Sequence, residues 1–91
     1  MRYEWDEAKR ESNLEKHGLD FINAWRVLEA EERAVFPTQS AQEERLKAIA
    51  RVEETTLVVI YTQRNTVTRI ISFRAASRSE RRRYEDAREH R

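Results

Sequence analysis

Residues 46–73 read LKAIARVEETTLVVIYTQRNTVTRIISF, and the spacing of apolar side chains in this stretch decides the fold class. From Leu46 onward apolar and polar residues alternate, which predicts a strand with one buried face. Residues 57–62 are apolar on both faces, as is typical of a central strand, and residues 67–73 predict a third strand because they are rich in β-branched side chains. Between the last two strands, residues 63–66 predict a turn in which Asn65 can adopt a left-handed conformation. The stretch therefore predicts an antiparallel meander.

Two helices are expected before this meander. Asp6 is a suitable N-cap for a helix that runs to about His17, and Gly18 fits the left-handed position that ends it. Asp20 is suited to cap a second helix, whose apolar stripe consists of Phe21, Ala24, Trp25 and Leu28. We expect this second helix to pack across the sheet, with Trp25 and Phe73 in the core.

A polar helix is expected at the C-terminal end, over about residues 78–89. Ser77 and Glu80 have the spacing of a capping box. Apart from Tyr84 and Ala87 the helix is polar, so we expect it to gain little from the core and to depend on ion pairs such as that between Arg81 and Glu85.

The region before Leu46 completes the predicted fold. Residues 30–45 are acidic and irregular, and Val35-Phe36 predicts a short edge strand that Pro37 ends. The fold class is therefore α+β, with two N-terminal helices, a small antiparallel sheet of three to four strands and a C-terminal helix. Ninety-one residues are too few for two cores, so residues 1–91 are expected to form a single domain.

Composition excludes several classes of protein. The chain has no cysteine and one glycine, which excludes a disulfide scaffold, a thiolate zinc site, cysteine catalysis and a glycine-rich phosphate loop. No apolar run approaches the length of a membrane span, and the N-terminus lacks the apolar core of a signal peptide. We therefore expect a cytoplasmic protein with no membrane partner and no cofactor.

The formal net charge of +1 hides a division of charge along the chain. Residues 1–46 carry 7 Lys/Arg and 11 Asp/Glu, whereas residues 47–91 carry 11 and 6. Within residues 64–83 there are 7 basic residues and 1 acidic residue. This division indicates a surface for a polyanion or an acidic partner in the C-terminal half, and a solvated face with incidental charge is the alternative.

The strand pattern places some of these cations relative to one another. Lys47 and Arg51 are four residues apart and share a face of the sheet, whereas Arg69 and Arg74 are five apart and share a face only if a bulge intervenes. Arg74 is the stronger candidate because it lies beside the helix start at Ser77, where backbone amides and the guanidinium could together hold a phosphate oxygen. The alternative is that Arg74 pairs with a carboxylate at the edge of the core.

The chain has two histidines, and neither belongs to a metal-ligand pattern. His17 lies at a helix end, where the dipole favours its charged form and suits a general acid, and the alternative is that it caps the last carbonyl groups. His90 lies near the C-terminus and is a poor catalytic candidate. Among the aromatic residues, Tyr84 could stack on a base beside the arginines, whereas Tyr61 is expected in the core.

Two blocks of motifs cover most of the chain. The first block comprises Glu4-Trp5-Asp6-Glu7-Ala8-Lys9, Asn13-Leu14, Lys16-His17-Gly18-Leu19 and Asp20-Phe21. The second comprises Leu57-Val58-Val59-Ile60-Tyr61-Thr62, Arg69-Ile70-Ile71-Ser72, Arg74-Ala75-Ala76-Ser77 and Glu80-Arg81-Arg82-Arg83-Tyr84-Glu85. In this order they resemble the BrnT toxins of bacterial type II toxin–antitoxin systems.

The resemblance implies a RelE-like ribonuclease fold and cleavage of RNA that arrests translation. It also implies a partner, the dimeric ribbon-helix-helix antitoxin BrnA. Toxin and antitoxin would form a hetero-oligomer that represses its own promoter, with DNA contacted through the antitoxin only. Ala50 departs from the family pattern, which usually has glycine there, so a bulge at that point is less expected.

Metal-free RNA cleavage needs the neighbouring 2′-hydroxyl as nucleophile, groups that transfer protons, and cations around the phosphate. The expected catalytic residues are His17 or Lys47, which would transfer protons, and Arg51 and Arg74, which would stabilise the charge on the phosphate. The expected RNA-binding residues are Arg64, Arg69, Arg78, Arg81 and Tyr84. The alternative function is a non-catalytic basic module that binds nucleic acid or an acidic protein. A transcription factor is disfavoured, because no helix precedes the terminal Arg-rich helix at helix-turn-helix spacing.

Overall fold

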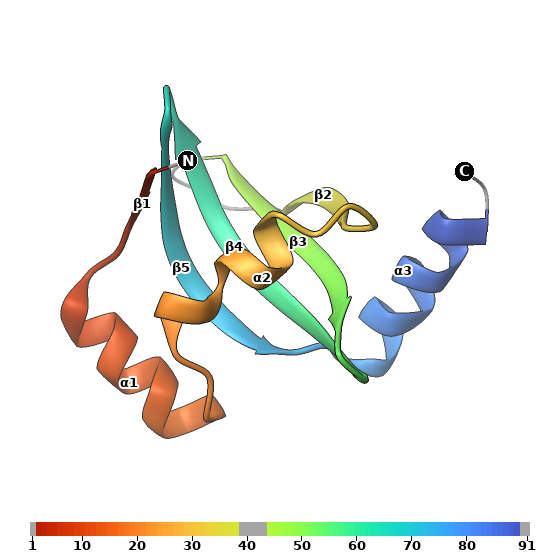
Figure 1. Cartoon of the computed structure of the whole chain (residues 1–91), viewed down its shortest axis with the longest axis horizontal. Helices are drawn as coiled ribbons and strands as arrows, with labels where there is room; N and C mark the ends of the chain where they lie inside the picture. Colours follow the sequence, from red (N-terminus) through yellow and green to blue (C-terminus); the bar gives the residue numbers. More distant parts are fainter. Residues whose placement is uncertain (1, 39–43, 90–91) are drawn as a thin grey trace.

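The chain folds into a five-stranded sheet with helical segments on both faces (Figure 1). The computed structural model describes residues 2–38 and 44–89. Its elements in chain order are β1 (Arg2–Glu4), α1 (Glu7–His17), the 3-10 turn η1 (Phe21–Asn23), α2 (Trp25–Leu28), β2 (Ala34–Thr38), β3 (Arg45–Val52), β4 (Thr55–Arg64), β5 (Val67–Ala75) and α3 (Arg78–Glu89). The strand order is β1-β5-β4-β3-β2, with β1 parallel to β5 and all other neighbours antiparallel. The α+β class is confirmed, whereas the sheet has more strands than expected, is not wholly antiparallel because β1 is parallel to β5, and is covered by a second helix shorter than expected.

The three strands expected from residues 46–73 form the centre of the sheet. The apolar strand β4 lies in the middle, between β3 and β5. Asn65 has the expected left-handed conformation, with φ of 54°, and β3 keeps a regular register with β4 through Ala50. Pro37 lies within the edge strand β2 instead of ending it, because an edge strand can lack one backbone N–H.

The larger core lies between the sheet and the segment formed by η1 and α2. Its helical side consists of Phe21, Ala24, Val27 and Leu28, and Phe73 is buried beneath it as expected. Trp25, however, is 49% exposed, so its expected place in the core is wrong. The cause is the 3-10 turn, which advances about three residues per turn and shifts the buried face onto Val27.

The smaller core lies on the opposite face, beneath α3, so the expectation that a chain of this length has only one core is wrong. Tyr84 is 1% exposed and packs with Ile49 and Val58. The expectation that α3 gains little from the core is therefore wrong, because one large ring anchors it. Arg81 donates to the carbonyl oxygen of Ala76 at 3.3 Å, and no ion pair within residues 44–89 joins Arg81 to Glu85.

The helix α1 lies along β5 and has the expected caps. Asp6 accepts a hydrogen bond from the N–H of Lys9, and Gly18 has φ of 71°. The buried side chain of Asn13 attaches the helix to the sheet: its Nδ2 donates to the carbonyl oxygen of Phe73 at 2.7 Å, and its Oδ1 accepts from the Phe73 N–H at 3.2 Å. The side-chain amide thus acts as a strand partner for Phe73.

Candidate active site

A bulge in β5 determines which cations share a face of the sheet. The register between β4 and β5 shifts by one residue, so Ile71 of β5 has no partner residue on β4. On either side of the shift, Arg69 and Arg74 lie opposite Thr62 and Val58, which are four apart on β4 and share a face. Both arginines therefore lie on one face although they are five residues apart.

This face, which we call the α3 face because α3 packs on it, also carries the cations of β3. Lys47 and Arg51 lie opposite even-numbered residues of β4, the same set that Arg69 and Arg74 oppose. Arg64 belongs to that set itself. The structure thus brings five of the expected site residues to one face.

Lys47 and Arg74 meet at the carboxylate of Glu80, which enters from α3. Arg74 binds it with two nitrogens, Nη1 to Oε1 at 2.7 Å and Nη2 to Oε2 at 2.9 Å. Lys47 Nζ lies 2.7 Å from Oε2. The expected capping box is present, because Ser77 N–H donates to Glu80 Oε1 at 2.9 Å and Ser77 Oγ accepts from Glu80 N–H at 3.2 Å. One carboxylate therefore joins the start of α3 to two strands.

The carboxylate of this cluster is more deeply buried than its two cations. The side chain of Glu80 is 9% exposed, against 23% for Lys47 and 30% for Arg74. Hydrogen bonds from Arg74 above all, and then from Lys47 and Ser77, hold the pKa of Glu80 well below its usual value despite burial. The hydrogen bonds that Arg74 donates to Glu80 raise the pKa of Arg74. The cluster holds two positive charges nearer to solvent than its one negative charge.

Both cations keep N–H donors for a further ligand. Arg74 Nη1 also donates to the carbonyl oxygen of Ala75 at 3.3 Å, so three of the five guanidinium donors have partners among the described residues. Lys47 uses one of its three ammonium hydrogens on Glu80. A phosphate oxygen that approaches from solvent can therefore be bound without breaking the cluster.

The remaining expected cations surround this cluster without joining it. Arg69 forms an ion pair with Glu4 of β1 at 3.2 Å. Arg51 and Arg64 are exposed near strand ends, and Arg78 is exposed in the first turn of α3, as is Arg81. These residues add positive charge around the cluster, which suits a polyanion.

Tyr84 is not available to stack on a base. Its ring is buried in the smaller core, and its Oη accepts a hydrogen bond from the N–H of Arg51 at 3.4 Å. The ring holds α3 on β3, so the expectation of an RNA-binding Tyr84 is contradicted by its burial.

His17 lies away from the cluster, exposed at the end of α1. It lines a pocket of about 220 Å³ at the edge of β5, together with Ser72 and two lysines of α1. Within the described residues no hydrogen bond or ion pair joins His17 to Lys47 or Arg74. The two expected proton-transfer residues are thus on different elements, and His90 lies outside the described residues.

The sequence patterns assigned Glu80 only a capping role. Its position as the single acidic residue of the basic stretch 64–83 is the signal that could have identified it as a site residue. Arg45 was also missed: it lies on the α3 face two residues before Lys47, and its Nε is buried with no hydrogen-bond partner in the described part of the chain.

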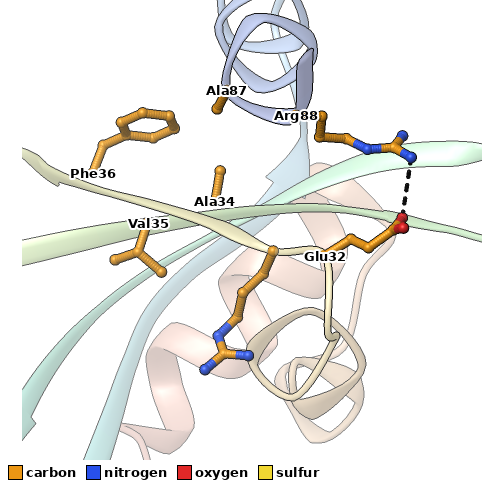
Figure 2. Close-up of a pocket in the computed structure, with 7 residues that line it drawn as sticks. Glu32, Ala34, Val35, Phe36, Ala87 and Arg88 are labelled. Carbon is orange, nitrogen blue, oxygen red and sulfur yellow. Dashed lines mark ion pairs between the residues drawn. The ribbon is translucent and has the colours of Figure 1, made fainter. Parts of the chain in front are cut away.

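A separate hollow of about 250 Å³ lies between β2 and α3 (Figure 2). Ala34 and Phe36 point toward α3, whereas Val35 points away (Figure 2). Arg88 of α3 forms an ion pair with Glu32 at 3.2 Å, drawn as the dashed line in Figure 2. This hollow differs from the Glu80 cluster in two ways: apolar side chains such as Ala34 and Phe36 line it, and Arg88 is already paired with Glu32.

Within residues 2–38 and 44–89, no three His, Asp or Glu side chains are grouped so that they could hold a metal ion. No helix in the described part of the chain has both the length and the apolar character needed to cross a membrane.

Comparison with known proteins agrees with these features. The model of one protein family, described as "Ribonuclease toxin, BrnT, of type II toxin-antitoxin system", matches residues 5–80. The matched region contains α1, β2 to β5 and the start of α3 as far as Glu80, and therefore all three members of the Lys47–Arg74–Glu80 cluster. No curated protein sequence matches the chain. Because the family match covers well over half of its residues and agrees with the resemblance of its motifs, the chain belongs to the BrnT family of ribonuclease toxins of type II toxin–antitoxin systems.

Proposed function

We propose that this chain cleaves RNA without a metal ion and that the reaction takes place on the α3 face, at the Glu80 cluster. The observation that supports this most directly is that Lys47 and Arg74 are both held by one buried carboxylate and keep unused N–H donors. Cations fixed before the substrate arrives stabilise developing phosphate charge without a cost of rearrangement. Glu80 is a positioning residue in this proposal.

The reaction follows from the chemistry of RNA. The 2′-oxygen attacks the adjacent phosphorus while the bond from phosphorus to the 5′-oxygen breaks, which leaves a 2′,3′-cyclic phosphate and a 5′-hydroxyl. The 2′-hydroxyl loses a proton and the 5′-oxygen gains one. Arg74 stays protonated in proteins and is assigned to the phosphate charge, with Arg51 beside it. The ammonium of Lys47 is assigned to protonate the 5′-oxygen and solvent water to accept the 2′-hydroxyl proton, and His17, which lies on another element, is the alternative general acid.

Cleavage of a defined RNA in the presence of EDTA tests this assignment. Arg74→Lys keeps the charge but cannot form the two-nitrogen pair with Glu80, so we expect it to slow cleavage about a hundredfold, and Lys47→Ala at least as much. Arg26→Lys is the matched control, because Arg26 lies on α2 and pairs only with the exposed Glu53 among the described residues.

Three results would contradict parts of the proposal. Cleavage that EDTA abolishes and Mg²⁺ restores would show that the reaction needs a metal ion. Wild-type rates for both Lys47→Ala and His17→Ala would remove these residues from proton transfer. RNA that stays intact with folded wild-type protein would favour the non-catalytic basic module.

Membership of the BrnT family implies an antitoxin partner. We propose that this partner is a BrnA-type ribbon-helix-helix protein, that it forms an autorepressing hetero-oligomer with this chain, and that it alone contacts DNA. Induced expression in bacteria should arrest growth and degrade bulk RNA, and co-expression of the neighbouring open reading frame should restore both. Arrest that the neighbour does not relieve would contradict the assignment of the partner.

A further inference from the structure

Apart from Arg10, which pairs with Glu7 and Asp20, the charged residues of α1 are sorted onto opposite sides of the helix. With about 100° between successive residues, one side carries Lys9, Ser12, Asn13, Lys16 and His17, and the other carries Glu7, Glu11 and Glu15. Asn13, at the centre of the basic side, is bonded to the backbone of Phe73. The basic side of α1 therefore lies against β5.

The basic side of α1 lines the pocket of about 220 Å³ at the edge of β5. Lys9, Lys16 and His17 contribute three groups that carry or can carry positive charge, Ser12 and Ser72 contribute hydroxyls, and no carboxylate lines the pocket. In the described part of the chain, the side chains of the two lysines and of His17 take part in no ion pair or hydrogen bond. The pocket thus combines unpaired positive charge with hydroxyl donors, which is a suitable environment for a phosphate group.

Ser72 connects this pocket to the α3 face. It lies opposite Ile60 of β4, and Ile60 lies opposite Lys47 of β3, so the three side chains form one row across the sheet. Arg74 follows two residues after Ser72 on β5 and lies on the same face. A strand of RNA that crosses the α3 face along this row passes from the Glu80 cluster to the pocket.

We propose that the pocket formed by Lys9, Ser12, Lys16 and Ser72 binds a backbone phosphate of the RNA strand whose scissile phosphate lies at the Glu80 cluster. This subsite rests on the proposed function, and it adds a positioning role for α1 that neither the sequence motifs nor the family description assigns. Phosphate contacts of this kind position a strand without reading its sequence. The subsite should therefore act on all RNA sequences alike.

Binding of a fluorescent 2′-O-methyl RNA octamer, measured by anisotropy over a series of salt concentrations, tests the subsite. This probe has no free 2′-hydroxyl and cannot be cleaved, so binding is read separately from activity. We expect the double variant Lys9→Gln/Lys16→Gln to bind several-fold more weakly at low salt. The slope of log affinity against log salt should be less steep by about 0.7 for each phosphate that the variant no longer neutralises. The matched control is Arg26→Gln/Arg33→Gln, which removes the same charge from the other side of the molecule and should bind like wild type.

The outcomes separate this inference from the proposed function. Equal salt slopes for wild type and Lys9→Gln/Lys16→Gln, with both proteins folded by circular dichroism, would overturn the subsite even if the wild type cleaves RNA. An equal loss of affinity in the Arg26→Gln/Arg33→Gln control would also overturn it, because net charge would then explain the effect. Competition by inorganic phosphate at equal ionic strength that is as strong in Lys9→Gln/Lys16→Gln as in wild type would also overturn it, because the anion would then bind outside the pocket. Failure of the proposed function would be seen in the separate cleavage assay, in which the wild-type protein would leave unmodified RNA intact.

Discussion

Glu80 is the residue on which the geometry of the site depends. A buried carboxylate is tolerated only while its partners remain, and here those partners are Lys47 and Arg74, the two cations assigned to the reaction. Glu80→Gln should therefore lower the free energy of unfolding by about 3 kcal/mol near neutral pH, measured by urea denaturation. Glu85→Gln, an exposed change one turn away on the same helix, is the control and should have little effect.

The contribution of Glu80 to stability depends on pH. Because its pKa is lowered on folding, this contribution is complete above the usual carboxyl value of 4.5 and is lost as the pH falls through the lower pKa of the folded protein. The difference in unfolding free energy between wild type and Glu80→Gln should hold from about pH 7 to about pH 5 and shrink toward about pH 3. A difference that stays the same at about pH 3 would contradict the assignment of that stability to the ionised carboxylate.

At the scale of single residues, the sequence predicts which face of the sheet the cations occupy better than it predicts the carboxylate that binds them. Alternation along β3 is enough to place Lys47 and Arg51 on one face, because it depends only on local strand geometry. The contact between Arg74 and Glu80 joins two elements, so no local pattern contains it, although a carboxylate partner for Arg74 was one of the two expected alternatives. The burial of Tyr84 has the same origin, since it depends on where α3 docks.

Elements whose formation depends on their own residue types could be predicted from the sequence. Elements that form because they pack or pair with a neighbouring element could not. The caps at Asp6 and Gly18 and the turn at Asn65 need particular residue types, and the structure confirms all three. β1 has three residues, too few for a periodic pattern, and it exists because β5 offers an edge. The 3-10 turn η1 likewise follows from packing on the sheet and displaces Trp25 from the core.

The attachment of α1 to β5 depends on the side chain of one residue. Asn13→Ala should lower the free energy of unfolding by about 2–3 kcal/mol, because it leaves both the N–H and the carbonyl of Phe73 without their partner. Glu11→Ala, on the exposed acidic side of the same helix, should be close to wild type. Equal midpoints of urea unfolding for the two variants would contradict this role of Asn13.

Over the whole molecule, the sheet separates two cores of unequal size. Both tryptophans lie on the side of the larger core, where Trp5 packs edge-on against Phe21 with ring centroids 6.3 Å apart. Tryptophan fluorescence therefore reports on that side, whereas far-ultraviolet circular dichroism also reports on α3.

This separation predicts how a defect in the smaller core will appear. In Tyr84→Ala, α3 loses its anchor, so we expect the circular dichroism transition to precede the fluorescence transition, whereas the two should coincide in wild type. Tyr84→Phe keeps the ring and loses only the hydrogen bond from Arg51, and its transitions should coincide. Coincident transitions in Tyr84→Ala would show that the two cores unfold as one unit.

The extra residue in β5 makes the bulge that absorbs it matter more than the identity of residue 71. A strand has two faces, and each inserted or deleted residue exchanges them for everything on one side of the change. Ile71 already acts as such an insertion and the bulge absorbs it, so deletion of Ile71 would leave Arg69 and Arg74 four residues apart and still on one face of a regular strand. The active face therefore requires the bulge itself, because a regular strand of the same length would turn either Arg69 or Arg74 toward the larger core.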